Sequence, residues 1–486
     1  MTYETPSVNE KLRFSNASFE TEDLFNRLAA NLRARQDRNF KLDCYYDGKR
    51  AIRQIGSVIP PQYYRLGLIL GWSAKAVDAL ARRCNLEMFV WPDGDLDSLG
   101  AQEIWDQNLL GSEVNQGITS SLLHGPVFTV VTEGNEGEPD VLIHFKDALN
   151  ATGEWNARRR GLDNLLSVTA CDEEGKWSEL ALYLDGETVT AQRVGGTWTI
   201  VDVSEHSLGV PVDMLPYKPR LKRPFGSSRI SRPVRALQDR AVNEWARLEG
   251  HMDVYSFPEF WMLGADESLF KNSDGSQKAS WQIMLGRIKG IPDDEDATNP
   301  RADVKQFPAS SPEPHLATLN AYAKLFARET SLPDSALAIT DVSNPTSAES
   351  YDASQYELIA EAEGAADDWS PGLRRTFLRA LAAKNGESEI PAEWASIDAR
   401  WRDPRYQSRA AKADAGSKVI GSVPWLAETE VGLELLGLDD QQIRRALSEK
   451  RRMTGSGILQ RLTAAAAQVS AQTEPEMSVM EPVESV

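Results

Sequence analysis

The sequence predicts an α+β fold, mainly helical, in which the strands form one block between helical regions. Apolar residues recur at helical spacing over 21–43, 61–85, 100–123 and 233–257. Residues 126–215 instead alternate with a period of two and are rich in Val, Thr, Ile and aromatic residues. A chain of 486 residues indicates roughly two to four structural units.

The strand block reads as an antiparallel sheet. Its runs are short, and Asp185-Gly186 and Gly195-Gly196 supply the chemistry of tight hairpin turns between them. Ahead of this block, Thr21 or the acids after it can cap the helix over 21–43. The helix over 61–85 is apolar nearly all round, which predicts a buried helix.

Two amphipathic helices are expected at 233–257 and 314–331, on either side of the short mixed segments of 258–312. The natural arrangement is an antiparallel helix pair with a small α/β domain at its tip. The narrow apolar stripes fit ordinary packing inside one chain. They also fit helices packed side by side in a ring, and the sequence alone slightly favours packing within the chain.

The rest of the chain is expected to be helical. Pro333 ends the second helix of the pair, and a Thr346-x-x-Glu349 capping box predicts a helix from about 346 to 369. WSPGLRR (369–375) should break it. Helix continues through 466, with Asp439 or Asp440 as a cap. The tail, 471–486, reads as disordered and acidic.

Composition narrows the functional classes. The net charge is −19, so a simple nucleic-acid binder, which needs a basic balance, is not expected. The odd set Cys44, Cys84 and Cys171 indicates free buried thiols in a reducing compartment. The most apolar run, LGLILGW (66–72), is too short to span a bilayer, and no signal peptide is visible, so a soluble protein without membrane contact is expected.

The sequence contains no recognisable enzymatic motif. The phosphate-binding GxxxxGK[ST], the GxSxG elbow and HExxH are all missing. Five histidines are scattered singly and read as structural or surface residues. The acidic run 293–296 reads as a solvated loop, with a divalent-cation site as the sharper alternative. No catalytic residue, metal or cofactor is therefore predicted.

A basic link interrupts this acidic chain. Residues from Lys218 to Arg240 include eight basic residues and one acid, Asp239. Such a patch can contact phosphates or pair with an acidic face of a neighbouring subunit, and the acidic total favours the subunit interface. The residues assigned to this link are Lys218, Arg220, Lys222, Arg223, Arg229, Arg232 and Arg235.

The opposite charge pattern follows the helix pair. Between Arg328 and Arg374 there is no Lys, Arg or His, while Asp and Glu occur ten times. The helix in this stretch has an expected buried stripe formed by Tyr351, Leu358, Ile359, Ala362 and Trp369. The acids Asp352, Glu357, Glu361 and Glu363 fall elsewhere, either on a solvated face or on a functional one.

These pieces, in this order, resemble the portal proteins of long-tailed (siphovirus-type) bacteriophages, the group typical of phages of Gram-positive hosts. The resemblance is carried by four stretches: YYDGKRAI, LPYKPRLKRPFGSSRISRPVRALQDRAVNEW, FARETSLPDSALAITDVSNPTSAESYDASQYELIAEAE and WRDPRYQSRAAKADAGSKVIGSVPWLAETEVGLELLGLDDQQIRR. Together they span most of the chain. No one of them is specific alone.

The resemblance implies a ring of about twelve copies of the chain at one capsid vertex. The ring is the channel through which a separate terminase motor packages double-stranded DNA, and through which DNA is retained and later ejected into the tail. Further implied partners are the terminase large subunit, a head-completion adaptor, and the major capsid and scaffolding proteins. The implied location is the virion, after assembly in the host cytoplasm.

The resemblance also implies a portal fold with named parts. These are a wing (1–232), a first stem helix (233–257), a clip (258–312), a second stem helix (313–332), a tunnel loop (333–345), a long wing helix (346–374), a crown (375–470) and the tail (471–486). The clip, which docks terminase and adaptor, offers Trp261, Phe270, Trp281 and Ile291. The tunnel loop would turn Thr340, Asp341, Ser343, Asn344, Thr346 and Ser347 toward the channel.

Two other classes stay open at this level. One is a soluble minor capsid scaffold without a DNA channel. The other is a hydrolase that uses carboxylates such as Asp367 and Asp368, which the lack of clustered ligands disfavours. A channel that gripped phosphates tightly would stall DNA, so an acidic, small-residue lumen is the arrangement expected of a portal.

Overall fold

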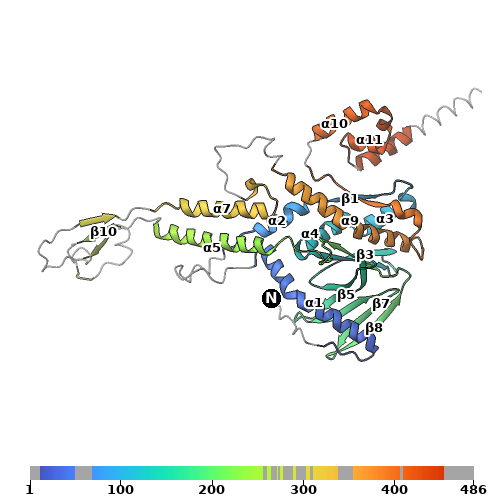
Figure 1. The fold of residues 1–486 in the computed structure, drawn as a ribbon, viewed down its shortest axis with the longest axis horizontal. Coiled ribbons are helices and arrows are strands. Elements are labelled where there is room, and N and C mark those ends of the chain that lie inside the picture. The colour runs from blue at the N-terminus through green and yellow to red at the C-terminus, as the bar shows by residue number, and fades with distance from the viewer. Residues whose placement is uncertain are drawn as a thin grey trace, which may run out of the picture. The chain divides into compact units, whose positions relative to one another are not determined.

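A computed structural model describes residues 11–49, 68–255, 260–263, 271, 274–276, 288–291, 303–306, 310–337, 354–405, 409–439 and 441–453. The chain divides into two compact units, residues 1–404 (unit 1) and 405–486 (unit 2). The fold is α+β and largely helical, as the sequence predicted (Figure 1).

The helices of unit 1 lie close to the segments with helical periodicity. They are α1 (Phe19–Tyr46), α2 (Trp72–Ala81), α3 (Ala101–Gln107), α4 (Leu110–His124), α5 (Arg232–Tyr255), α7 (Glu313–Glu329) and α9 (Tyr356–Lys384), with short 3-10 helices at Asp97–Leu99, Asp334–Ala336 and Ala392–Ser396. The cap of α1 is Ser18, whose side chain accepts from the Thr21 amide, so the helix begins two residues before the expected cap.

The period-two region forms two antiparallel sheets where one was expected. Its strands are β2 (Pro126–Glu133), β3 (Val141–Asp147), β4 (Ala151–Asn156), β5 (Gly161–Cys171), β6 (Trp177–Tyr183), β7 (Glu187–Val194), β8 (Thr197–Glu205) and β9 (Val212–Pro216). Three of them pair in the order β3-β2-β9 and five in the order β4-β5-β6-β7-β8. Gly186, Gly195 and Gly196 have positive φ in the two predicted hairpin turns.

A further strand pair joins distant parts of unit 1. β1 (Leu86–Val90) pairs antiparallel with β13 (Asp398–Trp401). The helix expected over 61–85 is present only as α2, since residues 50–67 lie outside the described residues and Arg82 caps its end. The sequence did not predict this sheet, because each strand is short and finds its partner some 300 residues away.

The expected helix pair is confirmed. α5 and α7 lie side by side and run in opposite directions (Figure 1). Between them in sequence lies a three-stranded sheet in the order β11-β10-β12, built from β10 (Phe260–Leu263), β11 (Ile288–Ile291) and β12 (Asp303–Gln306). β10 pairs parallel with β11 and antiparallel with β12.

The predicted break at 369–375 is wrong, because α9 runs without interruption from Tyr356 to Lys384 and carries Pro371 inside it. The reason is burial on both sides of the proline. Trp369, Leu373 and Phe377 are each at most 3% exposed in the main core of unit 1. Phe377 also stacks on Phe89 of β1 with ring centroids 3.8 Å apart. This packing outweighs the hydrogen bond that a proline removes from a helix.

Unit 2 is helical in its described part. It contains α10 (Arg409–Ser422), a 3-10 helix (Pro424–Glu428), α11 (Glu430–Leu435) and a helix over 441–453. The Gln442 amide donates to Asp439, and the Gln442 side chain accepts from the Asp439 amide at 3.3 Å. Of the two predicted caps, Asp439 is therefore the one that the helix uses.

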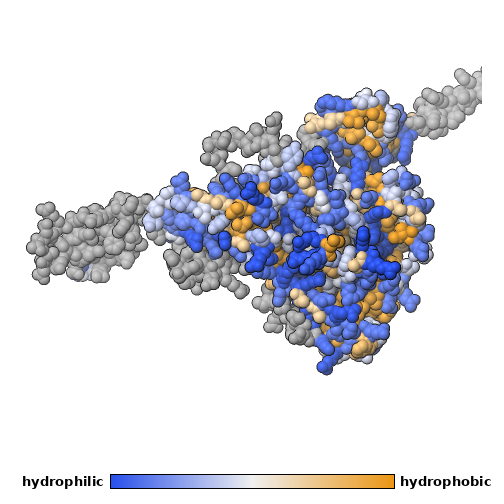
Figure 2. All heavy atoms as spheres, viewed as in Figure 1, coloured by the Kyte–Doolittle hydropathy of each residue, from blue (hydrophilic) through white to orange (hydrophobic). Residues whose placement is uncertain are grey.

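Hydrophilic residues cover most of the described surface on the face that Figure 2 shows, with separate hydrophobic patches among them. Within the described residues, no helix is both long and apolar enough to cross a membrane. Cys44, Cys84 and Cys171 are free thiols, as predicted, but the expected burial is right only for Cys84, since Cys44 is half-buried and Cys171 is exposed.

Candidate functional site

One buried guanidinium joins four separate segments of unit 1. Arg229 donates from Nε to the Ala76 carbonyl of α2 at 2.8 Å and from Nη2 to the Thr330 carbonyl at the end of α7 at 2.5 Å. Its Nη1 donates to the Tyr217 hydroxyl at 3.0 Å and lies 2.6 Å from Oε1 of Glu361 in α9. We call this set the Arg229 junction: Arg229, Tyr217, Glu361 and the Thr330 and Ala76 carbonyls.

Glu361 is the anionic centre of the junction. Its Oε1 accepts from the Tyr217 hydroxyl and from the Lys218 ammonium, both at 2.5 Å. Burial disfavours the carboxylate, but the charge and hydrogen bonds of Arg229, with those of Lys218 and Tyr217, outweigh burial and lower the pKa of Glu361 to about 2. Glu361 is therefore ionised at neutral pH.

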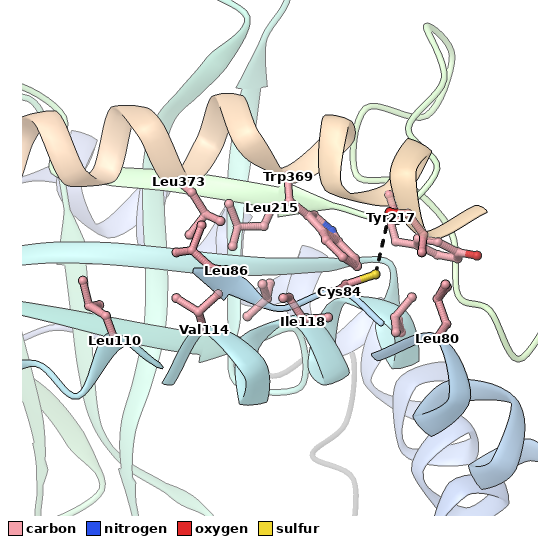
Figure 3. Close-up of a cluster of buried hydrophobic side chains, with 14 of the residues drawn as sticks. Leu80, Cys84, Leu86, Leu110, Val114, Ile118, Leu215, Tyr217, Trp369 and Leu373 are labelled. Carbon is pink, nitrogen blue, oxygen red and sulfur yellow. Dashed lines mark hydrogen bonds between the residues drawn. The ribbon is translucent and has the colours of Figure 1, made fainter. Parts of the chain in front are cut away.

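The junction is enclosed by the apolar core. Figure 3 shows Tyr217, Trp369, Leu80 and Cys84 packed together between α9, α2 and the strand that carries Leu215. The Cys84 thiol points to the Ala362 carbonyl of α9 at a sulfur–oxygen distance of 3.8 Å (Figure 3). Charges in such surroundings are stable only when they are paired, which the four contacts of Arg229 achieve.

Further polar contacts fix α9 along its length. The Trp369 indole donates to Ser121 Oγ of α4 at 3.0 Å. Asp213 of β9, whose side chain is 3% exposed, accepts from Arg375 at 2.6 Å and Arg379 at 2.8 Å. These two arginines are one helical turn apart, so both reach the same carboxylate. α9 is thus held to the strands and to α4 as one rigid body.

The Arg229 junction has a clear mechanical consequence. Thr330 precedes residues 338–353 in the chain and Glu361 follows them, and one side chain binds both. Arg229 therefore holds two points of the chain, one before 338–353 and one after it, at the same place in unit 1. A guanidinium suits this task because its planar fork binds several acceptors in fixed directions.

The structure divides the basic link into an inner and an outer part. Arg229 is buried at the junction, so its expected role in an interface or phosphate contact is wrong for this residue. Lys218 binds Glu361. Arg220, Leu221, Lys222 and Arg223 are exposed in a tight turn closed by two hydrogen bonds between the backbones of Arg220 and Arg223. Arg232 is exposed and Arg235 half-buried at the start of α5.

The acidic helix is divided in the same way. Glu357 and Glu363 are exposed on α9, whereas Glu361 is turned into the junction and so does not belong to an exposed acidic face. Leu358, Ala362 and Trp369 form the expected buried stripe. Asp352 and Tyr351 lie outside the described residues, as do all the tunnel-loop candidates: Thr340, Asp341, Ser343, Asn344, Thr346 and Ser347.

Of the four clip residues, two are placed by their strands. Trp261 lies in β10 opposite Lys289 of β11, and Ile291 of β11 is the partner of Leu263. Phe270 and Trp281 lie outside the described residues, together with the acidic run 293–296. The two placed residues therefore belong to adjacent strands of one small sheet.

The histidines are structural or surface residues, as expected, and at least three of them have polar partners. His124 lies 2.9 Å from Asp43, and His315 lies 2.7 Å from Glu244 of α5. His251 faces the Ser310 carbonyl at 3.0 Å. Among the residues that the structure describes, no group of three or more His, Cys, Asp or Glu side chains is arranged to hold a metal ion.

The pairing of Arg229 with Glu361 was not predicted, although one signal was present. Glu361 lies three residues after Leu358 and eight before Trp369, which places it beside the apolar stripe of α9. A carboxylate at such a position requires a buried cationic partner. The sequence did not indicate which of the link's cations that partner is.

Comparison with known proteins gives the family. The family described as "Phage portal protein, SPP1 Gp6-like" matches residues 26–455. The portal protein of Mycobacterium phage L5 is 26% identical over 433 residues, which cover 85% of this chain and 86% of that protein. The portal protein of Mycobacterium phage D29 is 26% identical over 431 residues, with the same coverage.

Solved structures from gene transfer agent (GTA) particles are also similar, at low scores. A chain from the neck of an empty particle, computed with C6 symmetry, has a TM-score of 0.41 at 15% identity, covering 75% of this chain and 90% of its own length. A chain from the neck of the native particle, computed with C12 symmetry, has a TM-score of 0.37 at 15% identity, covering 81% and 98%. The family match spans most of the sequence, and this chain belongs to the SPP1 Gp6-like family of phage portal proteins.

Proposed function

We propose that this portal chain forms a closed ring of about twelve copies, whose central channel passes double-stranded DNA into the head during packaging and out of it during ejection. The observation that carries the proposal is the Arg229 junction at the base of the α5–α7 pair. A channel that conducts a moving duplex needs its constricting segments held at fixed points, and the junction fixes both flanks of 338–353.

Residues 338–353 lie in the chain between the two flanks that Arg229 binds, and this leads us to predict their role as the tunnel loop. Thr340, Asp341, Ser343, Asn344, Thr346 and Ser347 are proposed to face the channel axis as the tunnel loop. They carry small polar or acidic side chains, which make few salt-sensitive contacts with phosphates. The duplex would therefore slide past them without being gripped.

The helix pair supports self-association. α5 and α7 bury one side against each other, yet Tyr255, Leu316 and Leu325 remain 36% to 48% exposed along them. The described part of the same chain leaves these three side chains partly uncovered. Copies of the chain arranged around an axis would cover these side chains. This supports the packing of helices side by side in a ring, which the sequence alone slightly disfavoured.

The same proposal assigns the other parts. The α5–α7 pair is the stem, and the sheet β11-β10-β12 with Trp261 and Ile291 belongs to the clip, which would dock the terminase large subunit and then the head-completion adaptor. Residues 1–232 and 346–374 would form the wing, which faces the major capsid and scaffolding proteins, and residues from 375 would lead into the crown. The ring would be built in the host cytoplasm and remain in the virion.

Electron microscopy of the purified chain tests the proposal. In a Cys171→Ser background, which removes the exposed native thiol, Asn344→Cys labelled with a gold cluster should give rings with a central opening and density for the label inside it. Asn16→Cys in the same background, labelled at an exposed site before α1, serves as the control and should mark a position away from the opening. Rings with the Asn344 label on the outer rim would remove the tunnel-loop assignment, and a chain that forms no ring would remove the proposal.

The two other classes are less well supported. A soluble minor capsid scaffold without a channel is not favoured by a portal-family match over residues 26–455. A hydrolase centred on Asp367 and Asp368 would need clustered ligands or a partnered base. Asp367 is exposed, and the described residues near it contain no metal-binding group.

A further inference from the structure

The exposed turn of the basic link is built as a projection. The segment 217–227 leaves and rejoins the body at one place, where the Ser227 amide donates to the Tyr217 carbonyl at 2.9 Å. Gly226 closes it with φ +67, and a Cβ there would lie 2.3 Å from the Tyr217 carbonyl oxygen. Phe225 anchors the base against Phe128, with ring centroids 6.3 Å apart.

The tip of this projection carries a combined apolar and cationic surface. We call Arg220–Arg223 the basic turn. Leu221 is 108% exposed, so its side chain is not covered by the part of the chain that the structure describes. None of Arg220, Lys222 and Arg223 forms an ion pair within the part of the chain that the structure describes. A rigid turn with a bare leucine among three cations has the make-up of a protein-binding element, since phosphate contact gains nothing from the leucine.

α9 presents the complementary surface. One stripe of this helix is exposed at intervals of four, three and four residues, and Glu357 lies beside it. We call this stripe the α9 face: Tyr356, Glu357, Ala360, Glu363 and Asp367. Tyr356 is 67% exposed, and Ala360, one helical turn further on, is exposed as well. The whole segment from 329 to 373 contains no cation that would repel the basic turn.

The two surfaces lie in the same region of unit 1. Lys218, two residues before the basic turn, binds Glu361 of α9 in its own chain at 2.5 Å. The tip of the turn, where Leu221 is fully exposed, is not covered by that helix. It is therefore open to the α9 of a second copy.

We propose that the basic turn of one subunit binds the α9 face of the next copy of this chain. Leu221 packs between Tyr356 and Ala360 of the neighbour, and the three cations pair with Glu357, Glu363 and Asp367 there. The contact joins two different surfaces of identical chains, which is the head-to-tail type of interface that closes into a ring. The proposal rests on the ring of the proposed function and names the contact that holds it.

A disulfide between subunits tests the geometry directly. In a Cys171→Ser background, Leu221→Cys combined with Tyr356→Cys should form, under mild oxidation, a ladder of covalent multimers on a non-reducing gel. Leu221→Cys combined with Phe19→Cys is the matched control, because Phe19 is 87% exposed on α1. This control should stay monomeric on the gel. A disulfide confined to monomers, or no disulfide in assembled rings, would overturn the proposal.

Charge reversal tests the chemistry. Lys222→Glu with Arg223→Glu should raise the protein concentration needed for half-assembly by more than about tenfold, because like charges would then face each other. Adding Glu357→Lys and Asp367→Lys to the same chain should restore assembly. Arg158→Glu with Arg193→Glu changes the net charge equally at exposed positions elsewhere and should leave assembly unchanged.

The outcomes separate this inference from the proposed function. If the wild-type chain forms no ring, the proposed function fails. If the wild-type chain and the charge-reversed variant form rings equally well, the ring stands and the assigned contact is wrong. Circular dichroism of each variant checks that its fold is intact, and the disulfide experiment decides the matter for any variant that is not folded.

Discussion

At the scale of single residues, the Arg229 junction is the most constrained part of this portal chain. Arg229 has a side chain that is 3% exposed, and Glu361 one that is 9% exposed, so neither can lose its partner to water. Burial opposes the charge on Arg229, but Tyr217 and Glu361 outweigh it and raise the pKa of the guanidinium. Removal of either charge, that of Arg229 or that of Glu361, should therefore strongly destabilise the folded chain.

The substitution Glu361→Gln should lower the free energy of unfolding by about 3 to 5 kcal/mol at pH 7, because it leaves Arg229 buried without a counter-charge. The pKa of Glu361 is lowered from 4.5 to about 2 in the folded chain. Its contribution is therefore complete above about pH 4.5 and is lost as the pH falls toward 2. The difference between wild type and variant should shrink over that window in urea unfolding curves.

Glu357→Gln is the matched control for this experiment. It removes a carboxylate from the same turn of α9, at an exposed position, and should change stability by no more than about 0.5 kcal/mol. Equal unfolding midpoints for Glu361→Gln and wild type at pH 7 would contradict the role assigned to the junction.

The thiols should differ sharply in reactivity. Burial raises the pKa of Cys84 to about 12, with the nearby charges of Arg229 and Glu361 as smaller influences, and its side chain lies in the core. Cys171 is exposed at the end of β5. Maleimide labelling of the native chain, followed by peptide mass spectrometry, should modify Cys171 and leave Cys84 intact until denaturant is added. Labelling of Cys84 in the native chain would mean that the junction opens.

At the scale of elements, periodicity predicted most of unit 1. The helices α1, α4, α5 and α7 and the strands β2 to β9 agree with their patterns, because each buries one face whose spacing the sequence displays. The β1–β13 pair was missed, since its strands of five and four residues depend on a partner far along the chain. The sequence predicted that the helix α9 ends near Pro371, because a proline inside a helix usually breaks it. That rule does not take into account the core that packs around α9.

Two glycines of α9 allow a matched test of that packing. At Gly372, a Cβ would lie 2.5 Å from the Met214 carbonyl oxygen and 2.6 Å from a Leu215 methyl group of β9. Gly372→Ala should therefore destabilise the chain by about 1 to 3 kcal/mol. Gly364→Ala meets no atom within 4 Å and should stabilise α9 by up to about 1 kcal/mol. Thermal unfolding of both variants measures the contrast, and equal effects would mean that α9 is less closely packed on β9.

At the scale of the whole molecule, the charge pattern of the sequence predicted less about the fold and the site than the order of its segments and the spacing of its apolar residues did. The acidic total indicated that DNA is not bound tightly, and the basic link stood out against it. The sequence did not show which residues of the basic link and of the acidic helix are buried and which are exposed. Burial depends on which residues come into contact in the folded chain. Arg229 and Glu361 are 132 positions apart, and only the fold brings them to 2.6 Å.

The same distribution of charge leads to a prediction for the assembled ring. Each chain contributes a net charge of −19. In the proposed ring, the basic turn would be covered by the neighbouring α9 face. Fluorescence anisotropy with a labelled duplex should then show weak binding to rings between 50 and 200 mM salt, with a slope of log K against log salt close to zero. Monomers separated by gel filtration expose the turn, and their slope should be more negative by up to about 0.9 for each of its three cations.

The comparison of rings with monomers distinguishes a channel that DNA slides through from one that holds it. Tight binding to rings, with a steep dependence on salt, would mean that several phosphates are neutralised in the lumen at once. Each such contact would have to break for every step of the duplex, which opposes rapid translocation. We expect rings to bind DNA weakly and with little dependence on salt, whereas monomers should bind it in a salt-dependent way through the basic turn. This is the result expected if the cations of the basic link serve assembly and do not bind phosphates in the lumen.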